Sequence, residues 1–151
     1  MKKNIFKYII MAVVSVNLLF ACNDDNKEDS YPVINLTEVG HDNSFTAKQG
    51  DDLHLEAEIT AENLIKVIDI NIFASNNTNA VIHEFFTQGK YIGVKNTEFH
   101  EHIDIPSDIP LGKYRLQFSV TDMKGHNSVK EVEINITEND GLDNYEHEDK
   151  K

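Results

Sequence analysis

Hydrophobic and polar residues alternate along several short segments of this chain, with the period of two that is typical of β-strands. The clearest segment runs from Leu53 to Ile59, where every second residue is apolar and the residues between are His54, Glu56 and Glu58. The same alternation recurs in residues 65–74, 113–121 and 131–136. This pattern predicts half-buried strands, each with one face in a core and one face in water.

Weaker strand patterns fill the rest of the central region. Residues 32–36 predict a first strand, which residues 45–47 would extend after a kink. Residues 80–86 and 91–94 predict two weaker strands around Gly89. Short strands separated by turn residues, each with one buried face, predict an all-β protein built as a single β-sandwich of about seven strands.

Residues 110–122, followed by Gly125, are similar to the penultimate strand and final hairpin of bacterial immunoglobulin-like domains. Tyr114 lies where such sandwiches place a corner tyrosine, whose hydroxyl hydrogen-bonds back to the backbone. Together with residues 53–59 and 99–106, this segment resembles a family of Bacteroidetes lipoproteins of unknown function. The resemblance implies an immunoglobulin-like antiparallel sandwich at the cell surface, and it implies no established activity.

The N-terminus predicts a lipoprotein signal peptide over residues 1–21. Three lysines precede an apolar run from Ile9 to Phe20, which is too short to span a bilayer. The run ends at Ala21, and Cys22 follows directly, as in a bacterial lipobox, where the cysteine takes a lipid group. The alternative is an ordinary signal peptide with a chance cysteine. We expect lipidation of Cys22, which is the one cysteine in the chain and therefore leaves no disulfide.

The predicted organisation beyond the signal peptide has three parts. Residues 22–31 form an acidic tether, residues 32–138 form the sandwich domain, and residues 139–151 form a disordered acidic tail. An acidic run directly after the lipidated cysteine resembles a surface-export signal, and a plain linker explains it equally well. We therefore expect an outer-membrane lipoprotein that is exposed at the cell surface, with a periplasm-facing orientation left open.

The charge of the chain excludes one class of function. The formal net charge is −12 at pH 7, and removal of the signal peptide with its lysines makes it more negative. A field of this sign repels nucleic acid and anionic membrane surfaces. No nucleic-acid partner is expected, and the chain should meet the lipid bilayer only through its N-terminal acyl anchor.

The candidate chemistry lies in residues 99–106, where two histidines and two carboxylates alternate with apolar residues. If this strand pairs with residues 53–59, then His54, His100 and His102 share the outer face with Glu56 and Asp104. Imidazole and carboxylate groups together suit Zn²⁺ or Cu²⁺ better than Ca²⁺ or Mg²⁺. The alternative is that these histidines are only polar residues on a solvated strand face.

One residue interrupts the alternation of this segment. If Phe99 and Ile103 both face the core, then Glu101 faces it as well. Either the regular strand begins after Glu101, or a β-bulge lies there, or Glu101 is at the rim of the sandwich. His41, His126 and His147 fall in predicted turns or in the tail, and they receive no role.

Three functions are compatible with these features. The first is a non-enzymatic, lipid-anchored binding or accessory module with an unknown protein or glycan partner. The second is a transition-metal-binding protein that uses the histidines of the strand face. The third is a carbohydrate-binding accessory lipoprotein, which the absence of tryptophan disfavours. No catalytic residue is predicted, because the chain lacks a G-x-S-x-G motif and its cysteine is the expected lipid site.

Overall fold

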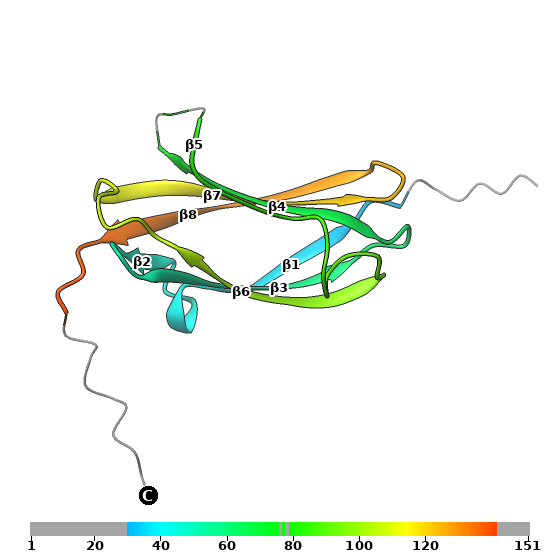
Figure 1. Cartoon of the computed structure of the whole chain (residues 1–151), viewed down its shortest axis with the longest axis horizontal. Coiled ribbons are helices and arrows are strands. Elements are labelled where there is room, and N and C mark those ends of the chain that lie inside the picture. The colour runs from blue at the N-terminus through cyan, green and yellow to red at the C-terminus, as the bar shows by residue number, and fades with distance from the viewer. Residues whose placement is uncertain (1–29, 76, 78, 142–151) are drawn as a thin grey trace, which may run out of the picture.

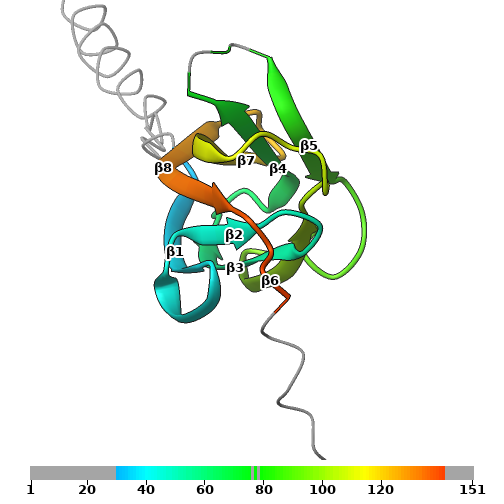
Figure 2. The ribbon, with the colours of Figure 1, turned by 90° about the vertical axis from the view of Figure 1, so that its left-hand side faces the viewer.

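The computed structural model describes residues 30–75, 77 and 79–141. The predicted signal peptide, Cys22, nearly all of the tether and most of the tail lie outside this range. The described part is an all-β domain whose strands form two sheets packed face to face (Figures 1 and 2). In this part of the chain, no helix is long and apolar enough to cross a membrane.

The first sheet has three strands in the order β1-β3-β6, and the second has five strands in the order β2-β8-β7-β4-β5. The elements are β1 (Val33–Val39), the 3-10 helix η1 (His41–Asn43), β2 (Thr46–Lys48), β3 (Asp52–Thr60), β4 (Ile65–Ala74), β5 (Ala80–Phe86), β6 (Asn96–Asp104), β7 (Gly112–Asp122) and β8 (Asn127–Thr137).

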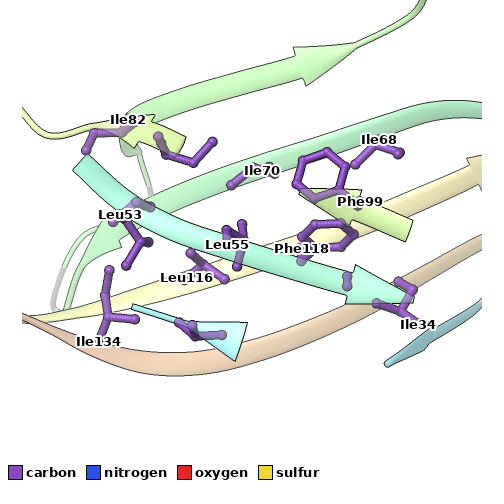
Figure 3. Close-up of a cluster of buried hydrophobic side chains, with 14 of the residues drawn as sticks. Ile34, Leu53, Leu55, Ile68, Ile70, Ile82, Phe99, Leu116, Phe118 and Ile134 are labelled. Carbon is purple, nitrogen blue, oxygen red and sulfur yellow. The ribbon is translucent and has the colours of Figure 1, made fainter. Parts of the chain in front are cut away.

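The core lies between the two sheets and is formed mainly by the residues that the alternation predicts (Figure 3). All four apolar residues of the segment 53–59 are buried, as are Ile68, Ile70 and Ile72 on the facing sheet. The rings of Phe99 and Phe118 meet edge to face across the sandwich, with centroids 5.2 Å apart. Burial of each such side chain contributes about 1.5–3 kcal/mol, so the alternation itself determines which strand faces point outward.

The segment around residues 45–47 differs from the prediction. It does not extend the first strand, because the chain crosses to the other sheet after Val39, and β2 pairs with β8 in parallel. The sandwich is therefore not wholly antiparallel. Four residues with positive φ make the crossing possible: Gly40, Asp42, Asn43 and Phe45.

The predicted weak strand at residues 91–94 is also wrong. This segment is a turn, and Gly89 before it and Gly93 within it have φ of 89° and 78°. Tyr91 is nevertheless buried, and its ring packs between Phe86 and Phe99. The apolar residues that suggested a strand therefore cover one end of the core from a loop.

The corner tyrosine behaves as predicted. Tyr114 is 3% exposed, and its hydroxyl donates a hydrogen bond to the Pro110 carbonyl oxygen at 2.7 Å. This bond ties the start of β7 to the connection that follows β6.

We predict that Tyr114→Phe lowers the free energy of unfolding by about 1–2 kcal/mol, because it leaves the Pro110 carbonyl without its partner while keeping the ring packed. Urea denaturation measures the change. Tyr31→Phe is the control, because Tyr31 is exposed. Equal stabilities for the Tyr114 variant and the wild type would contradict a structural role for this hydroxyl.

A buried carboxylate organises the hairpin between β7 and β8. Asp122 is fully buried, and its Oδ1 accepts the backbone N–H groups of Lys124 and His126. Its Oδ2 lies 2.8 Å from Asn63 Nδ2 and 3.0 Å from His126 Nδ1. Burial alone would raise the pKa of Asp122, but these hydrogen bonds and the His126 charge outweigh it and lower the pKa to about 2.

We predict a distinct acid dependence from Asp122. Because its folded-state pKa lies below its ordinary value of 3.8, its contribution to stability is present above pH 3.8 and is lost as the pH falls toward 2. Asp122→Asn should cost about 2 kcal/mol at neutral pH. The stability difference between wild type and variant should shrink between pH 4 and 2, and a constant difference over that interval would refute the assignment.

Candidate metal centre

The outer face of the three-stranded sheet carries the predicted site residues. β3 and β6 pair in antiparallel register from Asp52↔Asp104 to Thr60↔Asn96, with no interruption. This register places His54 directly opposite His102 and Glu56 directly opposite His100. The pairing that the sequence only suggested is therefore present, and it brings all three histidines onto neighbouring positions.

Both of these cross-strand pairs are of the closer type. The His54 carbonyl oxygen accepts a hydrogen bond from Gly40 N at 2.8 Å, on the side of β1. The His100 N–H and carbonyl instead meet the Tyr91 hydroxyl, on the free side of β6. These backbone groups of His54 and His100 therefore do not take part in the hydrogen bonds between β3 and β6. The pairs His54–His102 and Glu56–His100 are thus non-hydrogen-bonded pairs, in which the side chains approach most closely.

The three imidazole rings form one cluster. The His54 ring centroid lies 4.8 Å from that of His100 and 4.8 Å from that of His102. One ring nitrogen from each residue lies within 4.8 Å of the others. Three atoms at this spacing share a point about 2.8 Å from each, so small rotamer changes bring them to metal–nitrogen distances near 2.1 Å.

Carboxylates already orient each ring. Glu56 Oε1 lies 3.2 Å from His54 Nε2 and 3.1 Å from His100 Nδ1. Asp52 Oδ1 lies 2.8 Å from His102 Nδ1, and this hydrogen bond raises the pKa of His102. Each imidazole thus has one nitrogen against a carboxylate, the arrangement that holds histidine ligands in metal sites.

His54 carries the most informative atom of the cluster. Its side chain is 13% exposed, whereas those of His100 and His102 are about half exposed. Its Nδ1 is buried and has no hydrogen-bond partner among the described residues. A buried polar atom without a partner costs about 1–3 kcal/mol, so its presence calls for a ligand or another explanation.

The acidic residues that lie next to the histidines are only in part those that the sequence predicts. Asp104 lies opposite Asp52 at the end of the ladder, and in the described part of the chain neither Asp104 nor the predicted Glu56 is among the residues whose ligand atoms converge. Asp52, which the sequence reading did not include, takes the position beside His102. The structure also brings Glu38 and His41 next to His54. The sequence contains no signal that Glu38 and His41 lie near His54, because it is the left-handed loop after β1 that brings His41 to this face.

Glu101 is at the rim of the sandwich. The register of β6 is continuous through it, so the strand does not begin later and has no bulge there. Its Oε1 lies 2.7 Å from the Tyr91 hydroxyl and 3.4 Å from Lys90 Nζ. Burial, together with the nearby carboxylate, raises the pKa of Tyr91. Glu101 therefore avoids the core without re-aiming His100.

The surroundings of the cluster are acidic. A hollow of about 230 Å³ adjoins His100 and is lined in part by Glu56, Glu58 and Glu98. Carboxylates beside an imidazole cluster favour cations, and the donor set matches Zn²⁺, Cu²⁺ or Ni²⁺. The side chains of His100 and His102 are about half exposed, so an ion can reach the cluster from solvent.

Comparison with known proteins agrees with the fold and identifies the family. The structure defines the class of this protein as an all-β domain of two packed sheets. Residues 20–137 match the family described as "Domain of unknown function (DUF4625)", and the chain belongs to this family. No curated protein matches the chain.

Solved structures that resemble the chain share its fold only. One is wild-type OgpA from Akkermansia muciniphila, with a TM-score of 0.51 and 14% sequence identity over 71% of this chain. Another is the catalytically inactive form of OgpA in complex with an O-glycopeptide substrate, with a TM-score of 0.49, 15% identity and the same 71% coverage. The chain corresponds to 29% of each OgpA chain.

Proposed function

We propose that this protein is a non-enzymatic, lipid-anchored module of the cell surface that binds a transition-metal ion through His54, His100 and His102. The observation that carries the proposal is the convergence of three ring nitrogens within 4.8 Å, together with the buried Nδ1 of His54, which has no partner in the described part of the chain. An ion bound on the Nδ1 side of the His54 ring would give that nitrogen a partner and would remove the cost of leaving it unpaired.

The carboxylates have a supporting role in this proposal. Glu56 holds His54 by Nε2 and His100 by Nδ1, and Asp52 holds His102 by Nδ1. The opposite nitrogen of each ring then binds the ion, and the carboxylates fix the ring orientation and increase its basicity. Three imidazoles with water in the remaining position suit Zn²⁺ or Cu²⁺.

Two further parts of the proposal concern fold type and location. An immunoglobulin-like classification is supported by the two packed sheets and by the bond of the corner tyrosine Tyr114 to Pro110. Outer-membrane anchoring is supported by the apolar run that ends at Ala21-Cys22, which lies outside the described residues. A tether between anchor and domain would hold the metal-binding face away from the bilayer.

We predict that the purified mature protein in detergent binds one Zn²⁺ or Cu²⁺ ion per chain in isothermal titration calorimetry. The variant His100→Ala/His102→Ala should lower the affinity at least about tenfold, because it removes two of three nitrogen ligands. His83→Ala is the matched control: it removes an imidazole that lies against Asp69 on the other sheet and should leave affinity unchanged. No binding by the wild type, or equal binding by the double variant, would contradict metal binding at this face.

We predict that Cys22→Ala moves the protein from the membrane fraction to the soluble fraction, because the acyl chains are its expected means of membrane attachment. Fractionation of cells that express either form, followed by immunoblotting, measures the distribution. A Ser30→Ala variant controls for changes elsewhere in the N-terminal region. Retention of the Cys22→Ala protein in the membrane fraction would overturn the lipoprotein assignment.

A further inference from the structure

The loop that follows β1 brings a second set of metal-binding groups to His54. Glu38 is the penultimate residue of β1, and His41 opens η1. One ligand atom each from Glu38, His41 and His54 lies within 4.8 Å of the others. Figure 1 shows this loop, in cyan, on the outer side of the three-stranded sheet. Two imidazoles and one carboxylate form a donor set that binds Zn²⁺ in other proteins.

The backbone of this loop is strained and firmly held. Asp42, Asn43 and Phe45 have φ between 54° and 59°, a left-handed conformation that carries an energetic cost for each residue other than glycine. Asn43 offsets part of this cost, because its Oδ1 accepts the Val39 N–H and its Nδ2 donates to the Thr37 carbonyl. Gly40 cannot be replaced here, since a Cβ would lie 2.6 Å from Thr46 O.

The loop also orients the carboxylate. Glu38 Oε1 accepts the Asp42 N–H at 2.9 Å, while Oε2 lies 4.0 Å from His54 Nε2. The ring centroids of His41 and His54 are 5.4 Å apart. Strain that holds ligand-type side chains in place is a common property of binding sites.

We propose that Glu38, His41 and His54 form a second, alternative site for the same ion, which shares His54 with the site on β3 and β6. This inference rests on the proposed function. A neutral imidazole offers one nitrogen lone pair to a metal, so His54 serves only one ligand set at a time. The protein therefore binds one ion, in either of two adjacent positions.

The test uses the variant His100→Ala/His102→Ala, which leaves the loop set complete. Titrated with Cu²⁺ or Zn²⁺, this variant should still bind one ion per chain, at least about tenfold more weakly than the wild type. Adding His41→Ala or Glu38→Gln to it should abolish the residual binding. His83→Ala added to the same background is the control and should change nothing. Electron paramagnetic resonance of bound Cu²⁺ should show fewer coordinating nitrogens in the double variant than in the wild type.

The outcomes separate this inference from the proposed function. If the wild type binds no ion, both fail. If the wild type binds an ion but the folded double variant binds none, or if His41→Ala leaves the residual binding unchanged, only the loop site is overturned. Two ions bound at once by the wild type would overturn the inference that the two sites are alternatives that share His54. Circular dichroism shows whether each variant is folded. If His100→Ala/His102→Ala does not fold, His100→Gln/His102→Gln takes its place in the test.

Discussion

The register of the ladder between β3 and β6 is the constraint on which the outer face depends. It places Leu53 opposite Ile103 and Ala57 opposite Phe99 on the inner face, and all four side chains are buried. Because side chains alternate along a strand, a slip by one residue would turn the histidines inward and the apolar residues into water. The hydrophobic core therefore fixes the positions of the imidazoles, although none of them belongs to it.

The parts of this arrangement that follow from periodicity could be predicted, and those that depend on chain reversal could not. Alternation indicated the buried faces of the strands. Together with the assumed pairing of residues 53–59 with residues 99–106, it placed His54, His100 and His102 on one face. Asp52 could not be chosen over Asp104 from the sequence, because the two lie opposite each other at the end of the ladder and the contact of Asp52 with His102 depends on side-chain geometry. His41 required knowledge of a loop in which three non-glycine residues adopt left-handed φ, and sequence patterns do not reveal such conformations. The sequence correctly indicated a strand near residues 45–47, but it could not show which of the two sheets this strand joins.

The chemistry of the face reflects a balance between desolvation and charge. His54 lies deepest, with one nitrogen against Glu56 and the other buried without a partner in the described part of the chain. A protein under selection for stability alone would replace such a residue, since an apolar side chain there would avoid the penalty. Its presence beside several carboxylates gives the metal proposal a physical basis that an exposed His-x-His pair would lack.

The Tyr91 hydroxyl has a consequence beyond its contact with Glu101. β6 is an edge strand, and an edge strand with free N–H and C=O groups can pair with a strand of another chain. At His100 both groups already bond to the Tyr91 hydroxyl oxygen, which lies 3.2 Å from the His100 nitrogen and 2.8 Å from the His100 carbonyl oxygen. The ring therefore interrupts the hydrogen-bonding template in the middle of the edge. That interruption opposes edge-to-edge pairing of β6 with a strand of another copy, while the imidazole side chains of His100 and His102 stay accessible to solvent.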